Sequence, residues 1–196
     1  SYTCQKAVQM SAFSVISPLQ KSLAILTMLC VVGNDSRQAA GQTAGTSNTR
    51  EETLTAADGW PIHATYYESA AGKESPVVIL LAAAEGPDKK DARNRRVWQN
   101  TALALQKSGF AVIAVDLRKH GDSKPENTGP DSPLLKMAPG DYLVMANLDM
   151  DAVKAFLLSE HHNEKLNIRK TGIVAVGSSA MVAAASAVAD WAQKPY

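Results

Sequence analysis

The sequence has 196 residues, 45% of them hydrophobic, and its 20 basic and 19 acidic side chains leave a formal net charge of +1 at pH 7. A chain of this length and apolar content can bury one hydrophobic core, so we expect a single domain with extensions. The balanced charge gives no support for a nucleic acid partner, and because both cysteines, Cys4 and Cys30, lie in the first segment, no disulfide framework supports the globular part.

Residues 1–33 have the pattern of a signal peptide. Lys21 precedes an apolar run from Leu23 to Val32, the arrangement of a charged n-region and an h-region. The run is shorter than the roughly 20 residues of a membrane-spanning helix. We therefore predict export to the periplasm or the medium, with membrane association if the segment is retained. A lipid anchor at Cys30 has little support, because Leu29 stands where a lipobox needs a small residue, and a buried hydrophobic helix is the alternative interpretation.

Residues 34–50 contain no large apolar side chain and are rich in Gly, Ser, Thr, Gln and Asn. Such a segment cannot bury enough surface to offset the entropy of ordering, so we predict a flexible linker before a globular domain at residues 51–196. The domain is predicted to begin with a hairpin of two short strands, Glu52 to Ala56 and Ile62 to Glu68. Asp58-Gly59 forms its turn, since Gly accepts the positive φ that such turns need.

An uninterrupted apolar run, Val77 to Leu81, predicts a central strand covered on both faces. Apolar residues at helical spacing between Val97 and Lys107 then predict a helix, which would connect two parallel strands by a right-handed crossover. We interpret the basic residues before this helix as a solvated loop rather than as a site for an anionic substrate. They are Lys89, Lys90, Arg93, Arg95 and Arg96.

The stretch AVIAVDLRKHGDS, residues 111–123, organises the predicted fold. Its apolar half predicts a buried parallel strand, which ends in a polar loop at the carboxyl edge of the sheet, where open α/β sheets place their sites. The loop resembles the D-x-R-G-x-G-x-S signature of the α/β-hydrolases, most closely their lipase, esterase and peptidase-like branch. Lys119 stands where that family usually has Gly. The matching residues, which we expect to brace this edge, are Asp116, Arg118, His120, Gly121 and Ser123.

The resemblance implies an α/β fold, with a mostly parallel sheet, flanking helices and an antiparallel hairpin at the start. It also implies that the loop after the first parallel strand supplies one backbone N–H of an oxyanion hole, here near Ala82 and Ala83. That loop usually starts with His-Gly in the family, whereas residues 82–86 contain no histidine. A backbone donor needs no particular side chain, so the role is still open to these alanines.

Residues 124–140 contain four prolines and two glycines, which favours an irregular excursion over the carboxyl edge of the sheet. Helical spacing returns from Asp141 to Glu160. The apolar side of this helix is predicted to pack on the sheet, with Asp149 and Asp151 on the opposite side. His161 and His162 close the helix without further ligands nearby, and no metal site is predicted.

An apolar strand from Gly172 to Val176 runs through small residues into an Ala-rich helix predicted over 180–193, which is the context of a nucleophile elbow. Aligned with G-x-S-x-G, Ser179 is the candidate nucleophile and Gly177 precedes it by two residues. The backbone N–H of Ala180 would be a second oxyanion donor.

Met181 occupies the position of the second Gly in this motif, where a bulky side chain would distort the turn. Two alternatives stay open. Ser178 is the other candidate nucleophile, and the segment is equally consistent with a tight strand-to-helix connection that carries a serine N-cap and no chemistry.

The sequence contains no recognisable triad. In the resembling family an acid and then a histidine follow the serine, whereas here only Asp190 follows Ser179, and no histidine does. The resemblance covers residues 51–191 and stops before the remaining strands. We therefore predict a truncated member, either a shortened gene product or a half-domain completed by another chain, with strand 172–176 as an exposed edge that recruits a partner or a second copy.

Two function classes follow. The first is a hydrolase-derived chain whose complete relatives cleave esters, amides or lipids through an acyl-enzyme at a serine, with a small ester or amide as substrate. The second is a non-catalytic α/β module, degenerate at the elbow, that binds a small molecule or a partner. No cofactor is predicted, because neither G-x-G-x-x-G nor G-x-x-x-x-G-K-[ST] occurs.

Overall fold

The computed structural model describes residues 48–82 and 94–192. The signal-like segment at residues 1–33, Cys30 and most of the predicted linker lie outside these ranges. So do Ala83 and three residues of the basic loop, Lys89, Lys90 and Arg93. No helix in the described ranges is long and apolar enough to cross a membrane.

The predicted hairpin is confirmed. β1 (Thr49–Thr55) pairs antiparallel with β2 (Pro61–Tyr67), from Thr49 opposite Tyr67 to Thr55 opposite Pro61. Gly59 takes a φ of +83° in the turn, the left-handed conformation that favours Gly. β1 begins two residues inside the predicted linker, because Thr49 and Arg50 pair with β2.

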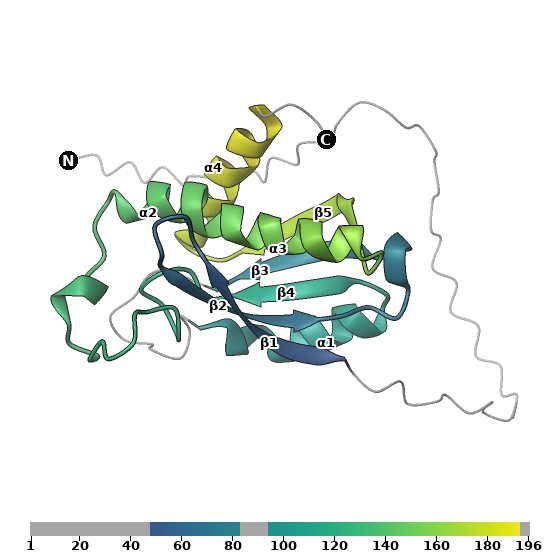
Figure 1. The fold of residues 1–196 in the computed structure, drawn as a ribbon, viewed down its shortest axis with the longest axis horizontal. Helices are drawn as coiled ribbons and strands as arrows, with labels where there is room; N and C mark the ends of the chain where they lie inside the picture. Colours follow the sequence, from purple (N-terminus) through teal and green to yellow (C-terminus); the bar gives the residue numbers. More distant parts are fainter. Residues whose placement is uncertain (1–47, 83–93, 193–196) are drawn as a thin grey trace, which may run out of the picture. The chain divides into compact units, whose positions relative to one another are not determined.

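The five strands form one mixed sheet in the order β1-β2-β4-β3-β5 (Figure 1). β4 (Ala111–Val115) is antiparallel to β2 and parallel to β3 (Pro76–Leu81), and β5 (Asn167–Ala175) is parallel to β3. β5 begins five residues earlier than the apolar pattern predicts. Its first six residues, NIRKTG, are mostly polar and none of them is buried, so no apolar pattern marks them as strand.

Within the described ranges, four α-helices connect and cover the strands. α1 (Gln99–Lys107) follows a 3₁₀ turn, η3 (Arg95–Trp98), and α4 (Ser179–Ala192) follows β5. The predicted helix at 141–160 consists of α2 (Asp141–Val144), a π-helical turn η5 (Met145–Asp149) and α3 (Met150–His162). Two further 3₁₀ turns are η1 (Gly72–Glu74) and, within the Pro-rich excursion, η4 (Pro133–Leu135).

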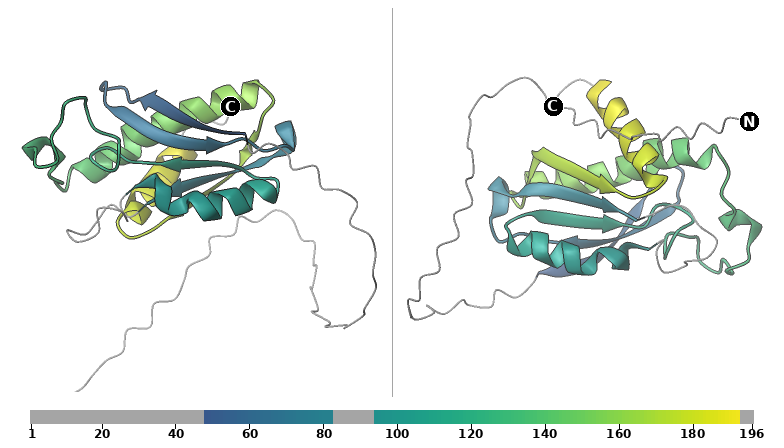
Figure 2. Two further views of the ribbon diagram at one scale, coloured as in Figure 1. Left: turned by 90° about the horizontal axis from the view of Figure 1, so that it is seen from below. Right: turned by 180° about the vertical axis from the view of Figure 1, so that it is seen from behind.

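Different helices cover the two faces of the sheet (Figure 2). Ile79 of β3 belongs to the larger core cluster with Val153 of α3 and Val182 of α4, whereas its neighbour Leu80 packs with Ala102 of α1. Because successive side chains of a strand point to opposite faces, an uninterrupted apolar strand fills both layers. All five residues of β4 are buried accordingly.

β5 pairs only with β3 and forms one edge of the sheet within the described residues. Val174 lies beside Leu80 in the register and so shares the face that α1 covers, yet 44% of its surface is exposed. Val176, directly after the strand, is 48% exposed. The strand predicted at residues 172–176 to be an exposed edge therefore lies at the edge of the sheet within the described residues.

Candidate functional site

Three parallel strands end at one edge of the sheet. Leu81 is in register with Val115 of β4 and with Ala175 of β5, so the segments that follow these residues emerge side by side (Figure 1). The carboxyl edge of a parallel sheet is where α/β folds carry their sites. Every predicted site residue within the described ranges lies at or near this edge.

The strand-to-helix turn after β5 is tight. Gly177 has a φ of +64°, and its carbonyl accepts a hydrogen bond from Ala180 N at 3.1 Å, while Ser178 O accepts one from Met181 N at 3.0 Å. The left-handed residue of this turn is the glycine, whereas neither serine takes a positive φ. The N–H of Ala180, predicted as an oxyanion donor, is thus engaged within the turn.

Ser179 lies against the end of the neighbouring strand. Its hydroxyl donates to Ala82 O, 2.5 Å away, and to Val176 O, 2.7 Å away, and the residue has no exposed surface. The structure thus brings the candidate nucleophile into contact with the start of the predicted oxyanion loop. In this arrangement the hydroxyl is shared between two carbonyl oxygens and faces the protein interior, whereas a nucleophile elbow presents its hydroxyl above the sheet.

The two neighbours of Ser179 in the motif differ sharply in exposure. Ser178 is 3% exposed and its Oγ has no hydrogen-bond partner within the described residues. Met181, in place of the second Gly, is 57% exposed. Its bulk is accommodated because the side chain leaves the turn outward, so the distortion expected from a methionine at this position does not arise there.

Asp116, at the end of β4, is the centre of a buried ionic cluster. Its carboxylate accepts Arg95 N and Arg95 Nη1, both at 2.5 Å, and Asp122 N at 3.1 Å. Arg95 also reaches Glu51 Oε2 and Asp122 Oδ2, at 2.7 and 2.9 Å. Burial raises the pKa of Asp116, against the opposing effect of Arg95 and the backbone donors.

The prediction that the basic loop is solvated is wrong for Arg95. The residue is 4% exposed, and its guanidinium is surrounded by three carboxylates, one from β1 and two from the signature stretch 111–123. Arg96, its neighbour, is on the surface as expected, with one ion pair to Asp122. Nothing in the local pattern separates these two arginines, because the partners of Arg95 are 44, 21 and 27 residues away in sequence.

Gly121 and Ser123 close the signature loop onto Asp116. A Cβ on Gly121, which has a φ of +49°, would lie 2.2 Å from Asp116 Oδ2, so only glycine fits there. Ser123 Oγ donates to Asp116 O at 2.6 Å and accepts from His63 N at 2.7 Å. The loop is therefore fastened to both β4 and β2.

Arg118 joins the hairpin turn to the helical layer. Its N–H and guanidinium donate to Asp149 at 2.9 and 2.7 Å, and its Nη1 lies 2.7 Å from Asp58 Oδ2. Hydrogen bonding to Arg118 lowers the pKa of Asp58, while burial raises the pKa of Asp149. The prediction that Asp149 lies on the polar side of its helix is wrong, since the residue is fully buried.

His120 is 5% exposed, and its Nδ1 lies 2.8 Å from Arg118 O. No hydrogen bond in the described part of the chain joins a histidine to Ser179, whose hydroxyl partners are both carbonyls. Asp190 forms an ion pair with Lys154 of α3, a full helix length from the elbow. The described ranges also contain no group of three His, Cys, Asp or Glu residues placed to hold a metal ion.

Comparison with known proteins shows that this chain is similar in fold to several solved structures. No protein-family model matches the sequence, and no curated protein matches it. Among solved structures, DcsB in complex with a substrate analogue aligns with a TM-score of 0.56 and 18% identity, over 74% of this chain and 42% of DcsB. The α/β-hydrolase GrgF from Penicillium sp. sh18 aligns with a TM-score of 0.52 and 19% identity, over 71% of this chain and 41% of GrgF.

This chain therefore spans about two fifths of the length of these solved structures. The shared region is the mixed sheet with its opening hairpin and flanking helices. At these identities the comparison concerns architecture alone, and the described residues have an α/β-hydrolase-like fold.

Proposed function

We propose that this chain carries the nucleophile of a serine hydrolase that cleaves a small carboxylic ester or amide through an acyl-enzyme at Ser179. One observation carries the proposal. Ser179 stands where β5 enters α4 and touches Ala82 at the end of β3, so the candidate nucleophile and the start of the oxyanion loop meet at the carboxyl edge. The hydrolase-like fold supports the same reaction class.

In the reaction, the Ser179 oxygen bonds to the substrate carbonyl carbon while its proton passes to a general base. Collapse of the tetrahedral intermediate breaks the bond to the alcohol or amine, which takes up that proton. Water then hydrolyses the acyl-enzyme, which releases a carboxylic acid and restores the hydroxyl. Because the sequence has no histidine after Ser179, we propose that base and acid come from a further segment or chain beyond β5.

Activity requires the elbow to open. Turning Ser179 outward breaks its hydrogen bond to Ala82 O, and unwinding the turn releases the Ala180 N–H from Gly177 O. One local movement thus frees both the nucleophile and an oxyanion donor. Gly177, already in a left-handed conformation, is the residue that can change its backbone angles at least cost.

Labelling of the full chain with a fluorophosphonate, followed by mass spectrometry, tests this proposal. We expect a covalent adduct on Ser179 that is lost in Ser179→Ala and kept in the matched variant Ser178→Ala, which removes the neighbouring buried hydroxyl. Labelling that survives Ser179→Ala but is lost in Ser178→Ala would move the nucleophile to Ser178. Labelling that survives both substitutions, or no adduct even when the segment or chain that supplies the base is present, would exclude the hydrolase and leave the non-catalytic binding module.

A further inference from the structure

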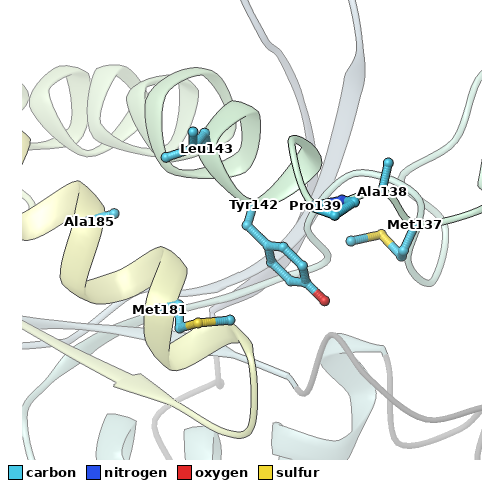
Figure 3. A pocket seen from close by; sticks show the side chains of 7 residues that line it. All are labelled: Met137, Ala138, Pro139, Tyr142, Leu143, Met181 and Ala185. Atoms are coloured by element: carbon cyan, nitrogen blue, oxygen red, sulfur yellow. The ribbon is translucent and has the colours of Figure 1, made fainter.

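A cavity of about 590 Å³ opens beside the elbow. One wall is formed by Met181 and Ala185 on the first two turns of α4, and the other by residues 137–139 and the start of α2 (Figure 3). Its volume lies within the range of roughly 300–1,000 Å³ typical of small-molecule sites. Met181, its nearest lining residue to the elbow, is two positions after Ser179.

The far wall of the cavity is held in place by Lys119, the residue that departs from the signature. Lys119 Nζ donates to Lys136 O at 3.0 Å and to Asp141 Oδ2 at 2.8 Å, and Asp141 Oδ2 also accepts from Ala138 N at 2.6 Å. These bonds tie the end of the excursion to the signature loop. The cavity is therefore preformed and needs no ordering of its far wall when a ligand enters.

The lining carries no charged side chain. It consists of two methionines, a leucine, a tyrosine, two alanines and a proline. Met181 and Leu143 are 57% and 64% exposed, so two large apolar side chains face solvent at its mouth. Methionine side chains adapt to apolar ligands of varying shape. The Tyr142 hydroxyl points into the open space between Met181 and Met137, where it offers one polar contact (Figure 3).

We propose that this cavity binds the unbranched hydrocarbon chain of a neutral acyl substrate whose carbonyl reacts at Ser179. The position of the reacting group rests on the proposed function, whereas binding of the chain does not. A second copy of the chain on this surface is an outcome of the test below.

Fluorescence titration with methyl cis-parinarate, a neutral polyene ester that brightens in apolar surroundings, tests the site on the full chain. We expect saturable binding that Met181→Glu weakens at least tenfold, because a carboxylate at the mouth must be desolvated when the chain enters. Val188→Glu is the matched control. It places the same charge at an exposed position of α4 outside the cavity lining, and should bind as the unchanged protein does.

Wild-type affinity in Met181→Glu, or equal weakening in Val188→Glu, would overturn the inference. So would conversion of a dimer into a monomer by Met181→Glu in size-exclusion chromatography, which would make the surface an interface between copies. Because the probe is itself an ester that Ser179 would cleave, the titrations are repeated in Ser179→Ala, where Met181→Glu should weaken binding by the same factor. If the probe binds but Ser179 is not labelled, the binding site stands and the proposed hydrolase activity is contradicted. If Ser179 is labelled but Met181→Glu does not weaken probe binding, the hydrolase activity stands and the binding site is contradicted.

Discussion

Lys119 replaces a glycine of the signature, and its side chain makes contacts that compensate for the change. The signature loop requires a φ of +67° at this position, a conformation that costs an ordinary L-residue about 1–2 kcal/mol and explains why glycine suits it. Lysine is tolerated because its ammonium group bridges Lys136 O and Asp141. The sequence shows the departure, but its compensating contacts come from a segment 17–22 residues away, which no local pattern reveals.

Arg95 and Arg96 make a matched pair for testing the buried cluster. Removing Arg95 leaves the buried carboxylate of Asp116 without its ionic partner, so we expect Arg95→Ala to lower the free energy of unfolding by about 3–5 kcal/mol. Arg96, with 63% of its side chain exposed, should cost less than about 1 kcal/mol when changed to Ala. Urea denaturation followed by circular dichroism measures both. Equal losses would show that Arg95 contributes no more than a surface arginine.

Periodicity predicts which segments form strands and helices but not where a helix changes its winding. The helical spacing of residues 141–160 is real, yet five residues, Met145–Asp149, form a π-helical turn. An extra residue in a turn rotates the following side chains by about 100° relative to a continuous α-helix. Asp149 lies four residues before the buried Val153, so helical spacing alone places it on the buried side, where it reaches Arg118. Its partner Arg118, 31 residues away in sequence, is what the local pattern does not reveal.

The anchor between α2 and the signature loop should depend on pH. Burial raises the pKa of Asp141, whereas Lys119 and the Ala138 N–H lower it. The lowering effects together are larger, so the pKa lies below its ordinary value of 3.8. A carboxyl with a lowered folded pKa stabilises the protein above its unfolded pKa and loses that contribution as pH falls through the folded value. We expect Asp141→Asn to be about 1 kcal/mol less stable than the wild type near neutral pH, with the difference vanishing towards pH 2.

Urea unfolding at several pH values measures this difference. Asp131→Asn, which changes an exposed carboxylate on the same excursion, serves as the control and should be as stable as the wild type near neutral pH. A stability difference between wild type and Asp141→Asn that stays constant down to pH 2 would contradict the assigned contact.

For the whole molecule, the order of strands explains how much of the site could be predicted. Parallel strands place their carboxyl ends together, so Ser179 and Ala82 could be expected at one edge once the strands were recognised. The direction of the Ser179 hydroxyl could not be predicted. It depends on which residue of the turn takes the left-handed conformation, and in this structure that residue is Gly177. The buried ionic cluster around Arg95 could not be predicted from the sequence either, because Asp116 and Glu51 belong to separate elements.

Within the described residues β5 forms an edge of the sheet, which leads to a prediction about assembly. Unpaired backbone groups along an exposed strand recruit another strand, and Val174 and Val176 add apolar surface beside them. Where no further segment or chain occupies this edge, we expect two copies to pair through β5, and Val174→Lys to weaken dimerisation at least tenfold in sedimentation equilibrium, since lysine on an edge strand opposes pairing. Val97→Lys, at a 48% exposed valine in η3, should leave it unchanged. If the wild type stayed monomeric at about 100 μM, or if both variants dimerised equally, β5 would not be the interface.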